Sequence, residues 1–225
     1  MTIVNRAIKF LVLYDFVVNF GFGLLAPIFA VFILQNIAGG SLEVIGTATA
    51  CYWIARITST VPLSRFMDKT DGERDEFYFA VVGTMITASI PLLYLTVSLP
   101  WHIYVLQFIY GLANSMVVPG WRILFTDHID KGKTGFEWSM DDIGVGLAVA
   151  LSAYIGAIIA EKFGFTIIML LVSLVGYIGI LLLLPLNEHS LTLSQLKRRK
   201  KLHSVRIRRA YNPPTKQPKI KFGAV

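Results

Sequence analysis

The sequence predicts an all-α integral membrane protein of six transmembrane helices with both termini in the cytoplasm. Three observations lead to this class. Of the 225 residues, 55% are hydrophobic and only 16% are charged, whereas a soluble domain is typically about one quarter charged. The apolar residues gather in runs of about 20, the length that crosses about 30 Å of hydrocarbon as a helix. Lys and Arg lie almost entirely on one side of these runs.

Charges, glycines and prolines bound six apolar segments, each long enough to span a bilayer. Barrel strands fit these segments poorly, because such strands need only about ten residues of alternating character. The first segment is longer than the apolar part of a signal peptide and no convincing cleavage site follows it, so we expect it to be retained. The predicted spans cover residues 10–34, 43–64, 77–98, 102–124, 141–160 and 164–186.

Charged or short connections separate the spans. The first begins after Arg6 and Lys9, and the third follows the charged loop 65–74. The second and the fifth each open with a serine that can cap a helix and with acids in the first turn, where the helix dipole favours negative charge. The fourth and the sixth follow short connections at 99–101 and 161–163, so neighbouring helices are expected to pack antiparallel.

The distribution of Lys and Arg predicts the orientation. Nineteen of the 21 lie on the side of the two termini, and only Lys162 lies on the other side. The positive-inside rule therefore predicts a multi-pass protein of the cell membrane with both termini cytoplasmic. Residues 1–9 form the N-terminus, 10–186 the bundle and 187–225 a basic cytoplasmic tail that we expect to be partly disordered.

Spans one to three and four to six look like two inverted three-helix repeats. Setting Pro27 against Pro119 also sets Asp15 against Gln107, so a polar residue precedes the proline by twelve positions in both. A repeat of three spans inverts its second copy, which is how many secondary transporters are built. Apolar segments also match by chance when they are slid past each other, so the repeat is a hypothesis.

The loop after the second span resembles a signature of the major facilitator superfamily. That signature, G-x-x-x-D-[RK]-x-G-[RK]-[RK], lies between the second and third helices of the family. Asp68 and Lys69 match it directly, Gly72 matches after one inserted residue, and Arg74 matches approximately. Ser64 stands where the signature opens with glycine.

The resemblance covers residues 10–186, six helices where members of the family usually have twelve. It implies secondary active transport of a small solute by alternating access, with the substrate bound near the bilayer midplane between two six-helix bundles. We expect a second copy of the chain to supply the other bundle in a homodimer. A different half of the same family, or the missing part of a truncated gene, is the alternative.

The resemblance also implies that this loop acts as a latch, a contact between the two bundles that holds the outward-facing form closed on the cytoplasmic side. In the family this loop meets the start of a helix in the opposite bundle, and by symmetry that helix would begin with Asp141 and Asp142 of a partner chain. These acids would repel Asp68 and attract Lys69 and Arg74, so the basic residues would hold the latch here. Without the resemblance, the loop is a solvated turn that obeys the positive-inside rule.

Two ionisable residues, Asp15 and Arg56, lie inside predicted spans, where a charge costs at least about 2.5–3.5 kcal/mol at the centre. Asn19 lies one turn from Asp15, and Tyr52 lies one turn from Arg56, so the four residues could form one polar cluster. We expect this cluster to anchor substrate or to couple transport to protons. The alternative is a structural ion pair that ties the first two helices together.

The fourth span carries a polar stripe, with Gln107 and Asn114 at helical spacing and Trp121 further along. We expect these residues to line a cavity, although the same spacing suits a helix–helix contact. The arginine that many members of the family carry on this helix is Gln107 here, so proton coupling through that arginine is not carried over.

The tail holds a run of cations about ten residues past the last span. Attraction to anionic lipid, at about 1 kcal/mol per Lys or Arg, explains such a run more simply than nucleic acid does. The run consists of Lys197, Arg198, Arg199, Lys200 and Lys201.

No metal-ligand cluster, nucleotide-binding loop or nucleophile–base set occurs in the sequence, so we expect neither an enzyme nor a cofactor. The competing function is a non-transporting membrane scaffold or partner subunit whose basic tail docks on lipids.

Overall fold

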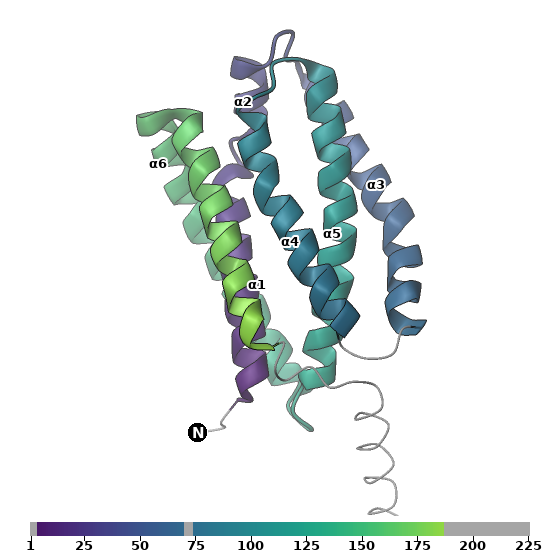
Figure 1. Ribbon diagram of the computed structural model, residues 1–225. Coiled ribbons are helices and arrows are strands. Elements are labelled where there is room, and N and C mark those ends of the chain that lie inside the picture. Colours follow the sequence, from purple (N-terminus) through teal and green to yellow (C-terminus); the bar gives the residue numbers. More distant parts are fainter. Residues whose placement is uncertain (1–3, 70–73, 187–225) are drawn as a thin grey trace, which may run out of the picture.

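Helices make up nearly all of the chain that the computed structural model describes, residues 4–69 and 74–186. None of these residues lies in a strand, so the predicted all-α class is confirmed for them. Figure 1 shows the helices side by side in one elongated bundle. They are α1 (Arg6–Leu25), α2 (Phe29–Asn36), α3 (Leu42–Lys69), α4 (Arg74–Tyr94), α5 (Pro100–His128), α6 (Thr134–Leu183) and the 3₁₀ turn η1 (Leu184–Leu186).

The first predicted span is broken at Pro27, between α1 and α2. Proline has no N–H to donate, and its ring crowds the carbonyl four residues earlier. The Ile28 N–H donates to the Leu25 carbonyl (3.0 Å), which is a tighter turn than that of an α-helix. Pro119, by contrast, lies inside the continuous helix α5. The two prolines aligned in the repeat hypothesis therefore shape their helices differently.

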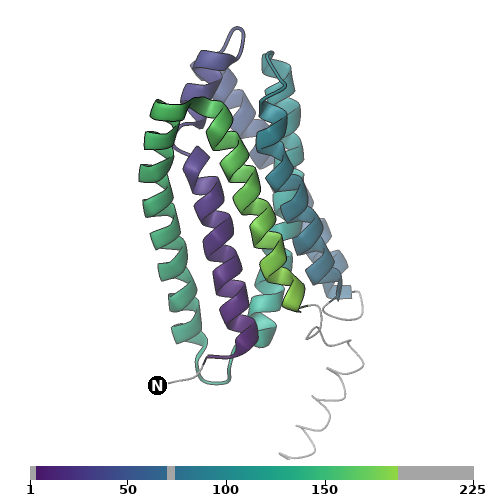
Figure 2. The same cartoon turned by 60° about the vertical axis from the view of Figure 1, so that its left-hand side comes forward.

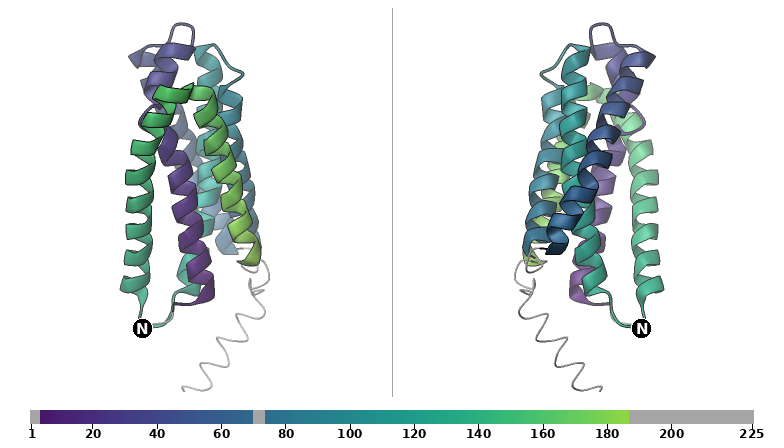
Figure 3. Two further views of the ribbon diagram at one scale, coloured as in Figure 1. Left: turned by 90° about the vertical axis from the view of Figure 1, so that its left-hand side faces the viewer. Right: turned by 90° about the vertical axis from the view of Figure 1, so that its right-hand side faces the viewer.

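The last two predicted spans are the two arms of α6, which folds back on itself at Gly164. This glycine has φ 78° and ψ 175°, a backbone conformation essentially confined to glycine. Figure 2 and the left view of Figure 3 show the two arms antiparallel, with α1 between them. Although α6 is one element of 50 residues, it consists of two packed helices joined at Gly164.

Four helical stretches within residues 4–69 and 74–186 are long and apolar enough to cross a membrane. Helix α3 has 28 residues but is not among the four, because Arg56, four threonines and two serines lower its apolar character. The prediction of six spans therefore stays a prediction. The four stretches are Arg6–Asn36, Arg74–Tyr94, Pro100–His128 and Thr134–Leu186, and the last of them holds both arms of α6.

Glycines allow the closest approaches between helices. Helix α1 packs against α6, α3 packs against α5, and α4 packs against both α5 and α6. A β-carbon at Gly156 of α6 would collide with the Leu24 carbonyl of α1, and one at Gly111 of α5 would collide with the Tyr52 carbonyl of α3. Small residues are the usual means by which membrane helices bring their backbones together.

Two groups of buried apolar side chains fill the bundle, one toward α2 and the other toward the start of α1. The first includes Phe32 and Ile168, and the second includes Leu11 and Tyr14. Tyr14 is fully buried, and its hydroxyl shares a hydrogen bond of 2.5 Å with Thr84 Oγ1 of α4. This bond links α1 to α4 through the interior of the bundle.

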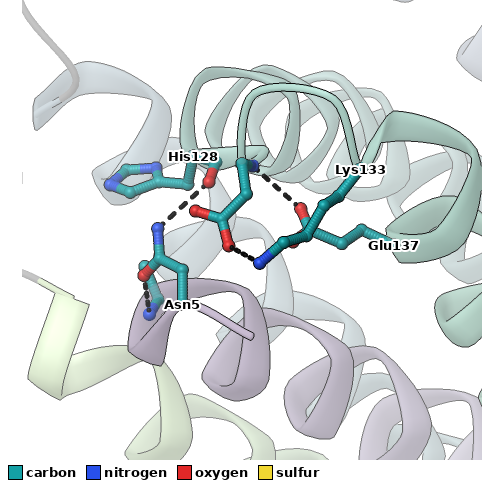
Figure 4. Close-up of polar contacts among 6 residues, drawn as sticks. Asn5, His128, Lys133 and Glu137 are labelled. Atoms are coloured by element: carbon teal, nitrogen blue, oxygen red, sulfur yellow. Dashed lines mark hydrogen bonds and ion pairs between the residues drawn. The ribbon is translucent and has the colours of Figure 1, made fainter. Parts of the chain in front are cut away.

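Polar contacts tie the starts of α1 and α6 to the end of α5, as Figure 4 shows. Asn5 caps α1 and donates from Nδ2 to the His128 carbonyl (3.1 Å). In the loop before α6, the Asp130 N–H donates to Glu137 Oε2 (3.0 Å), and Lys133 Nζ lies 3.0 Å from Asp130 Oδ2. The hydrogen bond from the Lys133 ammonium holds the pKa of Asp130 below its ordinary value.

Candidate functional site

A cavity of about 310 Å³ opens in the half of the bundle nearest α2, among helices α1, α2, α4, α5 and α6. This volume is at the lower end of the range of about 300–1,000 Å³ that is typical of small-molecule sites. No lining residue is charged. Five lining side chains carry polar groups: Asn19, Thr87, Tyr94, Gln107 and Tyr110. The rest of the wall is Phe22, Gly23, Leu25, Ala26, Phe29, Ile90, Pro91 and Val149.

Gln107 is the lining residue best suited to hold a polar ligand. Its side chain is 8% exposed, and its amide makes no hydrogen bond to any residue in the described part of the chain. Because Gln107 lines the cavity, this amide is free to pair with a ligand there. One such hydrogen bond would contribute about 0.5–1.5 kcal/mol to binding.

The break between α1 and α2 borders the cavity. Ala26 and Phe29, on either side of Pro27, both line it, as does Pro91 of α4. The Phe29 ring lies 5.3 Å from that of Tyr94, so aromatic rings close this part of the wall. Discontinuous helices at membrane depth are tolerated where they are buried or line a cavity, and they shape substrate sites in many transporters.

The predicted four-residue polar cluster is divided into two pairs. Asn19 Nδ2 donates to Asp15 Oδ1 (3.0 Å), and Arg56 Nη1 donates to the Tyr52 hydroxyl (2.7 Å). The ion pair between Asp15 and Arg56, which was the structural alternative, does not form between these two described residues. The reason is the packing order, because α1 packs against α6 whereas α3 packs against α5.

Asp15 faces charges on α5 and α6 instead. The cation whose charge acts on Asp15 is Arg122 of α5, and Asp15 acts in turn on the carboxylate of Asp141. Asp141 is buried, and its Oδ1 has no hydrogen-bond partner in the described structure. Its neighbour Asp142 is exposed. Of the two acids expected to meet the latch of a partner chain, only Asp142 therefore faces outward.

The predicted polar stripe on the fourth span does not line one cavity. Gln107 lines it, but Asn114 donates from Nδ2 to the Tyr110 carbonyl of its own helix (3.1 Å). Trp121 is 7% exposed and donates from Nε1 to the Leu11 carbonyl (3.3 Å). Fourteen residues of helix place Trp121 about 21 Å from Gln107 along α5, so it packs in the opposite half of the bundle.

The residues of the predicted latch lie at the ends of α3 and α4. Asp68 and Lys69 close α3, Arg74 opens α4, and all three are exposed. Gly72 lies outside the described residues. The predicted lipid-binding residues Lys197, Arg198, Arg199, Lys200 and Lys201 lie outside them as well.

Sequence reasoning missed most of the cavity wall. Thr87 and Tyr94 lie one turn to either side of Pro91, and Tyr110 lies one turn after Gln107. Polar aromatic residues at helical spacing from a proline or from a lone amide are a signal that could have found them. Among residues 4–69 and 74–186, no three His, Cys, Asp or Glu side chains gather closely enough to hold a metal ion.

The chain matches a known protein family. The family model described as Major Facilitator Superfamily matches residues 11–220, which is most of the chain. The matched range begins within α1 and includes every later helix. A search of curated proteins found no matching sequence.

Proposed function

The chain belongs to the Major Facilitator Superfamily, and from this membership we propose that it moves a small solute across the cell membrane by secondary active transport with alternating access. The family consists of membrane transporters, and the four long apolar stretches suit a multi-pass membrane protein. The transport mode and the membrane are the parts that we propose.

The cavity is the observation that carries this proposal. It lies inside the bundle, it is large enough for a small solute, and its wall includes the unpaired amide of Gln107. Most of the wall is apolar and aromatic, which is the usual composition of a small-molecule site. A solute held there would exchange hydrogen bonds with Gln107 and pack against the rings of Phe22 and Tyr110.

We propose six spans arranged as two inverted repeats, with both termini in the cytoplasm. Two features support this arrangement. The turn at Gly164 gives α6 two antiparallel arms, and α3 is long enough to cross a bilayer despite its polar residues. The one-sided distribution of Lys and Arg supports the orientation.

We propose that a second copy of the chain faces the first. The described helices form one bundle, whereas members of this family usually have two. In such a dimer, Asp142 is exposed in the third turn of α6, where it can meet Lys69 or Arg74 of the partner chain. The basic tail would then lie on anionic lipid of the inner leaflet.

The test is uptake into proteoliposomes from a uniformly carbon-13-labelled extract of small metabolites, with mass spectrometry of the vesicle contents. We expect at least one labelled compound to accumulate above the level in protein-free vesicles. Gln107→Ala should slow that uptake by roughly two- to tenfold, because it removes one hydrogen bond worth about 0.5–1.5 kcal/mol.

Gln35→Ala is the matched control, because Gln35 is an exposed glutamine on α2 outside the cavity. Its uptake should equal that of the unmodified chain. If Gln107→Ala took up solute as fast as the unmodified chain, the cavity would not be the site that binds the solute. Accumulation of no labelled compound, with protein inserted and folded, would favour the scaffold function.

A further inference from the structure

A second hollow lies between α3 and α5, away from the cavity. Its volume is about 300 Å³, and it follows the last turns of α3. Figure 1 shows α3 diverging from α5 toward this end of the bundle. Arg56, Thr60, Ser64 and Asp68 line the hollow from α3, and Arg122 lines it from α5.

Neither arginine in this groove has a carboxylate partner. No ion pair to Arg56 or Arg122 occurs among the residues that the structure describes, although Asp68 lines the same groove. Arg56 has neutral contacts: it donates to the Tyr52 hydroxyl, and its guanidinium carbon lies 5.1 Å from the centre of the Trp53 ring. No ion pair joins Arg122 to Asp15, which are both described residues.

The position of Arg56 makes an unpaired charge costly. It lies at the middle of α3, about 20 Å of helix from either end. A guanidinium group at such a depth must reach water, a partner or a ligand. Arg122 adds a second positive charge to the wall of the same groove, and like charges repel each other.

The two arginines outweigh the single carboxylate of the groove, Asp68, and the hydroxyl groups of the groove are already paired. The Thr60 hydroxyl donates to the Arg56 carbonyl (2.6 Å), and the Ser64 hydroxyl donates to the Thr60 carbonyl (2.8 Å). Both protons are therefore used within α3. Recognition of an anion would rest on the two guanidinium groups, whose planar donors match the oxygens of carboxylate and phosphate.

We propose that this groove binds an oxyanion, a carboxylate or phosphate group, on Arg56 and Arg122. The group can come from a soluble anion or from the headgroup of an anionic lipid, since both present the same oxygens. The inference goes beyond transport, because it concerns equilibrium binding and is tested without a gradient. Its failure would leave the uptake experiment and the cavity untouched.

The first arm of the test uses the full chain in nanodiscs of phosphatidylcholine, titrated calorimetrically with inorganic pyrophosphate. We expect one site per chain. Arg56→Gln and Arg122→Gln should each weaken binding by roughly tenfold or more, as expected for loss of a charge-assisted hydrogen bond. Arg65→Gln is the matched control, because Arg65 is an exposed arginine of α3 that does not line the groove.

The second arm places the same four proteins in nanodiscs that contain phosphatidylglycerol and measures retained lipid by native mass spectrometry. Phosphatidylglycerol held by the unmodified chain and Arg65→Gln, but lost from the two groove variants, supports the site and identifies a headgroup as its source. Pyrophosphate binding with no selective lipid retention supports the site and identifies a soluble anion.

Equal pyrophosphate affinity and equal lipid retention in all four proteins would overturn the proposal, and so would the absence of both in the unmodified chain. Arg122 is exposed, so Arg122→Gln is expected to fold even if the change at mid-helix Arg56 does not. Size-exclusion chromatography of each variant checks this, and the result with Arg122→Gln alone decides the outcome.

Discussion

The sequence predicts that Trp121 lines a cavity, but its contacts show a packing role. Its ring stacks on Phe125 with a centroid distance of 4.9 Å and meets the edge of Trp138 at 6.0 Å. Its Nε1–H bonds to the Leu11 carbonyl. One side chain therefore connects α5 to α1 and to the start of α6.

Replacing this side chain should destabilise the bundle. We expect Trp121→Ala to lower the free energy of unfolding by about 3–5 kcal/mol, the usual effect of truncating a buried Trp. Far-UV circular dichroism during titration of detergent micelles with SDS measures it. Trp101→Ala is the control, because Trp101 is 57% exposed and should change stability little. A Trp121→Ala protein as stable as this control would contradict the packing role.

Residue contacts within one helix could be predicted from the sequence, whereas contacts between helices could not. The pairs Asn19–Asp15 and Tyr52–Arg56 follow from a spacing of four residues, because such side chains share a helix face. The effect of the Arg122 charge on Asp15 depends on which helices pack together. Hydropathy carries no information on that order, because all faces of a membrane helix tend to be apolar.

At the scale of elements, Gly164 makes the turn between the two arms of α6. We expect Gly164→Ala to lower the free energy of unfolding by about 1–3 kcal/mol, because a side chain strains the backbone at this φ and ψ. The same SDS titration measures it. Gly146→Ala is the matched control, since Gly146 lies in the first arm and an added β-carbon there meets open space. A smaller loss at Gly164 than at Gly146 would refute the strain argument.

Helix α6 begins at Thr134, seven residues before the predicted fifth span. The other helix ends were predictable to within about five residues, because charges and short connections bound apolar runs. The internal breaks of the helices were not. Pro27 interrupts the helix whereas Pro91 and Pro119 do not, although all three share the same chemistry. Neighbouring helices can satisfy a backbone group that a proline frees, so the outcome depends on packing as well as on sequence.

At the scale of the molecule, the proposed homodimer predicts that the assembly has twice the mass of one chain. Native mass spectrometry of the chain in lipid nanodiscs should give twice 25.1 kDa, because a second bundle is needed to face the first. Asp142→Lys should weaken the dimer by placing like charges against Lys69 and Arg74, whereas Glu43→Lys, at the opposite end of the bundle, should not. A monomer at every protein concentration would indicate that a different half or a longer chain supplies the second bundle.

The polar composition of α3 has a consequence for how the protein is made. An arginine near the middle of a helix disfavours release into the bilayer by about 2.5–3.5 kcal/mol on the scale of the protein-conducting channel, and four threonines reduce the apolar character that offsets it. Helix α3 should therefore leave the channel slowly and stay in it until a helix that packs against it has been synthesised. Its closest neighbour, α5, is synthesised two helices later, so the ribosome must extend the chain past α4 before α3 has a surface against which to insert.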